Sequence, residues 1–258
     1  MLLQDKSGII FGVANKRSIA YACAQSASAQ GARLILTYQG ERLGKTVEAL
    51  AEALPNEAIA IPCDVADEAS VDEAFERIAE FVPDPDFGVH SIAFAPREEL
   101  EGRFVDTTRD GWAKALDVSA YSMTTIARRM EPLMTKGGSL VTMTYFGSEK
   151  VMPHYNVMGP AKAALESSVR YLASDLGPSG IRVNAVSAGP IRTLAASGVS
   201  GFQQFLEIAK ANSPLRRNTE PAEVGDATVF LVSDMSRGIT GTTMWVDSGY
   251  HIMAVKPL

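Results

Sequence analysis

Tyr155 and Lys162 are the two residues of this sequence whose types and spacing most directly indicate chemistry. They lie seven positions apart in a segment whose apolar residues recur every three or four positions, so a helix would place both side chains on one face. The phenol can donate a hydrogen bond, and the lysine can be a cation held beside a bound cofactor. The pair therefore indicates a reaction site that adjoins a cofactor.

Lys162 borders an apolar stripe, so its environment has two interpretations. The side chain either extends along the helix to water or holds its charge beside a cofactor, and the sequence leaves both open. Pro160 is unfavourable inside a helix. With Asn156 as the expected N-cap, Pro160 removes only an early hydrogen bond and Tyr155 lies just outside the helix. The stripe consists of Met158, Ala161, Leu165, Val169, Leu172 and Leu176.

A turn near the start of the chain could hold an anion. It runs from Gly12 to Ala20 as Gly-x₅-Ser-x-Ala and departs from the usual G-x-G-x-x-G fingerprint. Gly12 permits a tight turn, and Ser18 is the expected N-cap of the next helix. The first-turn amides around Ser18 and Ile19 would face the anion. The same residues also fit a plain strand-to-helix turn.

Two further strand ends carry polar residues that suit a dinucleotide. Gln39 stands where an acidic residue usually binds the ribose hydroxyls of NAD, and no pair of basic residues follows it, which favours NADH over NADPH. Arg42 is either a ligand of a 2′-phosphate or an exposed helical residue. Asp64 either accepts from the adenine amino group, with Val65 packed on the ring, or caps the following helix.

The pattern of the whole chain predicts a fold that brings such strand ends together. Apolar segments typical of strands alternate with helical segments, which predicts an α/β fold. We expect a single-domain, doubly wound parallel sheet of Rossmann type over residues 1–258, with helices on both faces; a (β/α)₈ barrel is the alternative. Residues 191–218 are the least regular and are expected to form a substrate-binding loop and helix insertion. Strands are expected at 8–14, 32–38, 58–63, 89–94, 139–144, 181–187 and 243–246, and helices at 18–30, 42–54, 66–82, 109–134, 156–176, 202–212 and 221–233.

The composition excludes several classes of function. The chain has 258 residues, with 24 basic and 30 acidic side chains and a net charge of −6, which argues against nucleic acid or an anionic membrane as the main partner. Cys23, Cys63 and the three histidines show no metal-ligand spacing, so no metal is expected. With no evident signal peptide or membrane-spanning run, a cytoplasmic location is expected.

Together these motifs closely resemble bacterial enoyl-[acyl-carrier-protein] reductases, the NADH-using members of the short-chain dehydrogenase/reductase superfamily. The resemblance extends from about residue 8 to residue 254. Its most specific element is the Tyr-x₆-Lys spacing, because ordinary short-chain reductases have Tyr-x₃-Lys and Met158 stands where that tyrosine would be. Ala93 departs from the glycine of many relatives by one methyl group. The matching segments are Ser18-Ile19-Ala20, Tyr38-Gln39, Cys63-Asp64-Val65, His90 to Pro96, Tyr145 to Lys162, and Ser187 to Ala195.

The resemblance implies a reaction and the residues that serve it. Hydride from NADH would add to the β-carbon of a trans-2-enoyl thioester, and Tyr155 would donate to the thioester oxygen as enolate charge develops. Tyr145 would lie beside it in the pocket, Lys162 would hold the nicotinamide ribose, and Ala95 would touch the substrate. The implied catalytic residues are thus Tyr145, Tyr155 and Lys162. The implied NAD site consists of Gly12, Ser18, Ile19, Gln39, Asp64, Val65, Ile92, Lys162, Ile191, Thr193, Leu194 and Ala195.

The resemblance also implies partners. The substrate would be the enoyl thioester of acyl carrier protein or of coenzyme A, and the enzyme would be a homotetramer. An acidic carrier protein requires a basic landing site, for which Lys210, Arg216 and Arg217 are candidates, although they are equally a solvated charge cluster. Apolar residues between 194 and 208 would line the acyl chain.

Two other functions stay open. A short-chain reductase of 3-oxoacyl thioesters or other carbonyls would use a serine or threonine such as Thr142 or Thr144, but Met158 disfavours it. A non-catalytic NAD(H)-binding redox sensor would keep the nucleotide turn, yet such proteins often lose the tyrosine or lysine that is present here.

Overall fold

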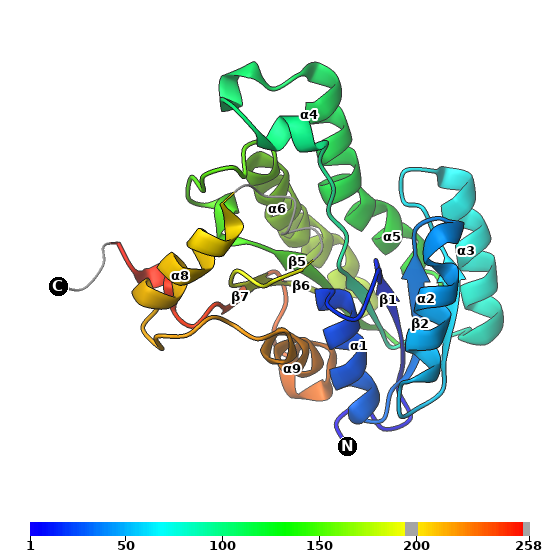
Figure 1. The fold of residues 1–258 in the computed structure, drawn as a ribbon. Helices are drawn as coiled ribbons and strands as arrows, with labels where there is room; N and C mark the ends of the chain where they lie inside the picture. The colour runs from blue at the N-terminus through cyan, green and yellow to red at the C-terminus, as the bar shows by residue number, and fades with distance from the viewer. Residues whose placement is uncertain (194–200, 255–258) are drawn as a thin grey trace.

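The fold is built on one parallel sheet of seven strands in the order β3-β2-β1-β4-β5-β6-β7 (Figure 1). It is seen in a computed structural model that describes residues 1–193 and 201–254. The order reverses between β1 and β4, so a crevice is expected where their carboxyl ends diverge. The strands are β1 Ser7–Phe11, β2 Arg33–Tyr38, β3 Ala58–Pro62, β4 Phe87–His90, β5 Gly138–Thr144, β6 Ile181–Ala188 and β7 Thr243–Val246.

Helices cover both faces of this sheet, as the alternating pattern predicts. One apolar core lies under α1 (Ile19–Ala29), α2 (Glu41–Glu52) and α9 (Pro221–Val232). A second core lies under α3 (Glu68–Phe81), α5 (Ser122–Met130) and α6 (Met158–Leu176). Burial on both faces explains why the strands are apolar at nearly every position. The doubly wound Rossmann-like fold is therefore confirmed.

Two helices extend beyond the sheet. In Figure 1, α4 (Arg109–Leu116) stands above the sheet and α8 (Phe202–Asn212) lies beside the last part of the described chain, around Tyr250. The expected helices at 202–212 and 221–233 are confirmed to within one residue at each end. Within the described ranges, no helix combines the length and the apolar character that crossing a bilayer requires.

Three expected elements that precede β5 differ clearly from those observed. The first strand ends at Phe11, and the fourth ends at His90 rather than residue 94, because Phe94 bonds through both its amide and its carbonyl to the Ser119 hydroxyl at 2.9 Å. The long helix expected at 109–134 is α4 followed by a π turn at Asp117–Tyr121 and then α5, which ends at Met130. Sequence periodicity does not reveal the extra residue of a π turn.

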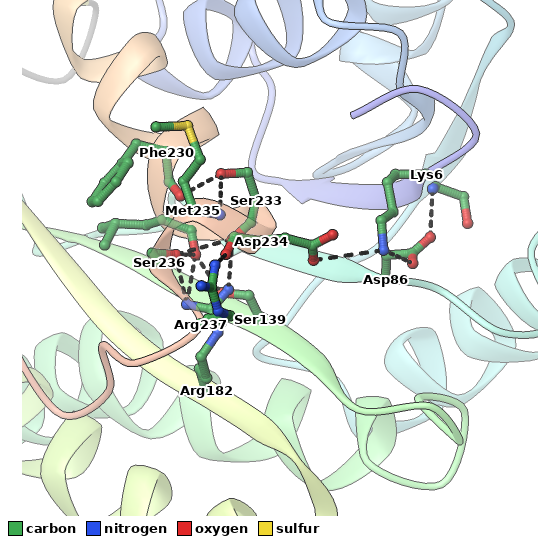
Figure 2. Close-up of polar contacts among 12 residues, drawn as sticks. Lys6, Asp86, Ser139, Arg182, Phe230, Ser233, Asp234, Met235, Ser236 and Arg237 are labelled. Carbon is green, nitrogen blue, oxygen red and sulfur yellow. Dashed lines mark hydrogen bonds and ion pairs between the residues drawn. The ribbon is translucent and has the colours of Figure 1, made fainter. Parts of the chain in front are cut away.

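At the amino edge of the sheet, Arg182 of β6 binds the carboxyl end of α9 (Figure 2). Its guanidinium donates to the Leu231 carbonyl at 2.9 Å, the Ser233 carbonyl at 3.2 Å and the Ser236 hydroxyl at 2.8 Å. The Ser139 hydroxyl also donates to the Leu231 carbonyl, at 2.9 Å. These donors satisfy carbonyls that a helix leaves unpaired at its end, so α9 and the segment that follows it are fixed to the sheet.

We predict that Arg182→Met lowers the free energy of unfolding by about 2 to 3 kcal/mol, because it removes three hydrogen bonds from a charged donor to part-buried acceptors. Urea unfolding measures the difference. Arg237→Met is the matched control, since the exposed Arg237 contributes one weak bond, 3.3 Å long, to the Asp234 carbonyl; it should change stability by less than about 0.5 kcal/mol. Equal effects of the two substitutions would contradict the assignment.

Candidate active site

The carboxyl ends of the strands bring the sequence-predicted residues to one edge of the sheet. Parallel strands all end at the same edge, so side chains far apart in the sequence become neighbours there. The residues that follow β1, β2, β3, β4, β5 and β6 are, in that order, Gly12, Gln39, Asp64, Ile92, Tyr145 and Ile191.

Gly12 makes the turn after β1 and lies against the segment after β4. Its φ is +91°, and its amide donates to the Thr37 carbonyl at 3.2 Å. A Cβ at this position would lie 2.6 Å from the Ser91 carbonyl oxygen and 2.8 Å from Cγ1 of Ile92. Only glycine fits, because both the backbone conformation and the space exclude a side chain.

Ser18 begins α1 as the sequence predicts. Its hydroxyl accepts from the Tyr21 amide at 3.3 Å and donates to the Asn15 carbonyl at 2.7 Å. Ile19 is the first helical residue, so the free amides of the first turn lie at the same sheet edge as Gly12. This end of α1 therefore has the partial positive charge that favours an anion.

Gln39 and Asp64 are brought together at the ends of β2 and β3. The Gln39 amide donates to Asp64 Oδ2 at 3.0 Å. The alternative role of Asp64 as a helix cap is wrong, because Asp67 is the N-cap of α3 and accepts from the Ala69 amide at 3.0 Å. Asp64 instead accepts from the Ala66 amide within its own turn, at 3.0 Å.

Tyr145 and Tyr155 form an aromatic pair beside the end of β5. Their ring centroids are 5.0 Å apart, and the rings meet edge to face at 72°. A side chain at Gly147 would overlap the Tyr155 ring, so glycine there lets the ring lie close. Burial raises the pKa of both phenols, and the charge of Glu166 adds to the rise at Tyr155. Both phenols therefore keep their protons and can donate hydrogen bonds.

Lys162 is buried, with 5% of its surface exposed. Its Nζ donates to the main-chain carbonyl of Met143 on β5 at 2.8 Å. The interpretation that the side chain extends along the helix to water is therefore wrong. Burial lowers the pKa of Lys162 to about 8, and the charge of Glu166 opposes this shift.

Glu166 is a part of this site that the sequence analysis missed. It is buried one helical turn after Lys162, and its Oε1 accepts from the Thr144 hydroxyl at 2.5 Å. A carboxylate in this position compensates the charge of a lysine that has lost its water. The spacing of four residues on a predicted helix was the signal that could have found it.

His90 was also missed. It is buried at the end of β4, with Nδ1 2.7 Å from the Thr142 hydroxyl and Nε2 2.8 Å from the Ser122 hydroxyl. The Ser122 hydroxyl donates to the Val118 carbonyl at 2.7 Å, so Nε2 must carry the histidine proton. Burial, followed by the charge of Lys162, lowers the pKa of His90 to about 3. His90 is thus a neutral link between β4, β5 and the start of α5.

The start of α6 differs from the expected one. Asn156 is not the N-cap: Val157 occupies that position, and its side chain makes no capping bond. Pro160 is therefore the third helical residue, and its missing amide hydrogen costs no intrahelical bond. Asn156 instead has a φ of +36°, which places it in the left-handed region.

Of five further residues predicted to line the site, the structure describes three. Ala95 is half-buried after β4, and Ile191 is buried in the core under α1 and α9. Thr193 bonds through its amide to the Ile191 carbonyl at 2.8 Å. Leu194 and Ala195 lie outside the described residues.

The expected insertion contains α8 and a basic segment. The Phe205 ring packs edge to face on Tyr250 with centroids 6.2 Å apart, so it contacts the C-terminal segment rather than open space. Arg217 forms an ion pair with Glu223 at 2.5 Å, whereas Arg216 donates to the Ala211 carbonyl at 2.6 Å. Among the described residues, no group of three or more His, Cys, Asp or Glu side chains could hold a metal ion.

Comparisons with known proteins identify the family of this chain. Residues 12–251 match the sequence profile described as Enoyl-(Acyl carrier protein) reductase. The chain belongs to the enoyl-[acyl-carrier-protein] reductase family. It is 53% identical to the enoyl-[acyl-carrier-protein] reductase [NADH] FabI of Bacillus subtilis, over 98% of each chain.

Solved structures of this family have the same fold. The Bacillus cereus enoyl-acyl carrier protein reductase with NADP⁺ and indole naphthyridinone superposes with a TM-score of 0.97 at 51% identity, covering 98% of this chain and 99% of the other. The Anaplasma phagocytophilum reductase in complex with NAD gives 0.96 at 52% identity, covering 100% and 98%.

We predict that Gly12→Ala in this reductase lowers the free energy of unfolding by about 2 to 4 kcal/mol, from backbone strain plus overpacking. Gly180→Ala is the matched control: its φ is +73°, but its Cβ would lie 3.5 Å from the Gly137 Cα, an ordinary contact. Strain alone should then cost about 1 kcal/mol. Urea unfolding compares the two, and an equal loss would show that the crowding at Gly12 has no effect.

Proposed function

We propose that this protein reduces the trans-2 double bond of enoyl thioesters of acyl carrier protein, with NADH as the hydride donor. The observation that carries the proposal is the protonated phenol of Tyr155 packed against Tyr145, with buried Lys162 seven residues later. Met158, which occupies the tyrosine position of ordinary short-chain reductases, is itself buried in α6. The spacing from tyrosine to lysine is therefore the one typical of enoyl reductases, with Tyr155 as the hydrogen-bond donor.

The residues present fit a dinucleotide. The close approach at Gly12 and the free amides at the start of α1 suit a pyrophosphate. The hydroxyls of Ser148 and Ser187 are buried near the same edge without a partner among the described residues, so a bound ligand would satisfy them. When bound, NADH supplies the hydride that adds to the β-carbon. Ser18, Ile19, Val65, Ile92, Ile191 and Thr193 complete the proposed cofactor site.

The choice of NADH over NADPH follows from charge. The Gln39 amide can bind ribose hydroxyls while Asp64 orients it. The acidic Glu41 in the first turn of α2 and the carboxylate of Asp64 would both repel a 2′-phosphate. Arg42 is exposed and provides the one basic side chain in that turn.

Tyr155 and Lys162 have different roles: Tyr155 binds the substrate and Lys162 binds the cofactor. The raised pKa of Tyr155 keeps its proton available, so the phenol donates a hydrogen bond to the thioester oxygen as negative charge develops there. Tyr145 packs against the Tyr155 ring and limits its orientation. Lys162, fixed by the Met143 carbonyl, orients the nicotinamide ribose and adds positive charge nearby.

A carbonyl reductase is the second candidate, and the threonines disfavour it. Thr142 is bonded to His90 and Thr144 to Glu166, so neither hydroxyl is available to a ketone. A non-catalytic sensor is disfavoured because both Tyr155 and Lys162 are in place.

We expect the purified protein to oxidise NADH when a trans-2-enoyl thioester is added, and to oxidise NADPH more slowly. The absorbance of the reduced nicotinamide measures both rates. Tyr155→Phe should lower kcat by about 10²-fold, as loss of an oxyanion donor does, and leave the Kd for NADH unchanged. Lys162→Met should raise that Kd about tenfold, the effect of one or two lost hydrogen bonds.

The outcomes separate the candidates. Turnover of a 3-oxoacyl thioester without turnover of the enoyl thioester would reverse the ranking. Binding of NADH with no turnover of either would support the sensor. Full activity in both variants would remove the roles given to Tyr155 and Lys162.

We also infer a homotetramer. The outer face of α5 and α6 carries an open groove lined by Thr124, Ala164, Ser167, Ser168, Tyr171, Leu172 and Asp175, and Tyr171 is 72% exposed. A large exposed aromatic side chain over a groove suits contact with a second copy. Light scattering should give a mass four times that of one chain, and Tyr171→Glu should give a smaller species. A monomeric wild-type protein would contradict the inference.

The other assignments are proposals of the same kind. The chain acts as one NAD-binding domain, with residues 191–218 as its substrate-binding insertion. Lys210 and Arg216 receive the acidic carrier protein, because the charge of Arg217 is compensated by Glu223. The protein works in the cytoplasm, where the buried free thiols of Cys23 and Cys63 would stay reduced.

A further inference from the structure

The backbone on both sides of Tyr155 is in an unusual conformation. His154 has a φ of +60° and Asn156 a φ of +36°, so two non-glycine residues in the left-handed region flank the proposed hydrogen-bond donor. The Tyr155 amide donates to the Met152 carbonyl at 3.2 Å, and the Tyr155 carbonyl accepts from the Met158 amide at 2.9 Å. Residues held in such a conformation concentrate at functional sites, where the surroundings must compensate the strain.

The side chain of Asn156 makes contacts that His154 does not. Its Nδ2 lies 3.3 Å from the Glu101 carbonyl and 3.4 Å from the Gly102 carbonyl and donates to both. Asn156 is half-buried, whereas His154 is exposed. Asparagine adopts the left-handed conformation more readily than most residues. At residue 156 it therefore permits the positive φ and also supplies an amide that donates to the two carbonyls.

Glu101 and Gly102 belong to the segment of residues 94–106, which follows β4 and carries Ala95. Ser119 of the π turn fixes the start of this segment by bonding the amide and carbonyl of Phe94. Glu99 fixes its middle, because the buried Glu99 carboxylate accepts from the Thr108 amide at 3.1 Å. The Asn156 amide then ties the later part of the segment to the residue next to Tyr155.

We propose that Asn156 is a positioning residue for the enoyl thioester. Its left-handed backbone aims the Tyr155 phenol, and its amide holds residues 94–106 so that the acyl group is confined between Ala95 and Tyr155. This inference rests on the proposed function, since it concerns how the same site holds its substrate. The two parts of the role lie in different atoms and can be separated by substitution.

Asn156→Gly keeps the backbone conformation and removes the amide. We expect KM for the enoyl thioester to rise about threefold to tenfold, the effect of losing two long hydrogen bonds, with kcat nearly unchanged. Asn156→Ala also penalises the left-handed backbone, so kcat should fall by a further factor of about five. Asn156→Asp tolerates the backbone but cannot donate, and its carboxylate would repel the Glu101 and Gly102 carbonyl oxygens, so KM should rise at least as much as in Asn156→Gly. His154→Gly is the matched control and should leave both constants unchanged.

Hydrogen exchange tests the coupling without turnover. In Asn156→Gly, amides of residues 97–106 should exchange faster than in the wild-type protein and in His154→Gly, while the Kd for NADH stays constant. Unchanged exchange and KM in Asn156→Gly would overturn the role of the amide, and equal kcat in the glycine and alanine variants would overturn the role of the backbone. A wild-type protein that fails to reduce enoyl thioesters would instead overturn the proposed function, and the exchange comparison would still decide whether Asn156 holds this segment.

Discussion

The site depends on a lysine whose ammonium has been removed from water. A buried cation is costly unless carbonyls and an opposite charge replace its hydration. Lys162 obtains one replacement from the Met143 carbonyl and another from the field of Glu166, one turn further along α6. The Met143 carbonyl belongs to β5, and the Thr144 hydroxyl of the same strand holds Glu166. The packing of α6 against the end of β5 therefore also sets the environment of the lysine.

Three consecutive residues at the end of β5 serve different neighbours. The hydroxyls of Thr142 and Thr144 bond His90 and Glu166 on the face of the sheet covered by α6, and the Met143 side chain packs in the opposite core. This follows from the alternation of side chains along a strand. Its consequence is that β4 and α6 are both bonded to one strand end, immediately before Tyr145.

Much of this architecture could be predicted from local sequence. The alternation of apolar strands and amphipathic helices predicts the sheet, and the Tyr155 to Lys162 spacing predicts the residues that meet there. The partners of those residues could not be predicted in the same way. Thr144 and Glu166 are 22 positions apart, and Asn156 and Glu101 are 55 apart, so their pairing depends on the packed fold. The predicted N-cap at Asn156 was wrong because asparagine is favoured both at N-caps and in the left-handed region.

The π turn at Asp117–Tyr121 has a consequence for how such a fold can change over evolution. A π turn holds one residue more than the α-helix around it, and one residue corresponds to a rotation of about 100°. Insertion or deletion of one residue here would rotate α4 about the helix axis, while α5 stayed packed on the sheet. It would also carry Ser119 away from Phe94 and release the segment after β4. A change of chain length at this one position can thus move α4 and the segment after β4 without altering the sheet below them.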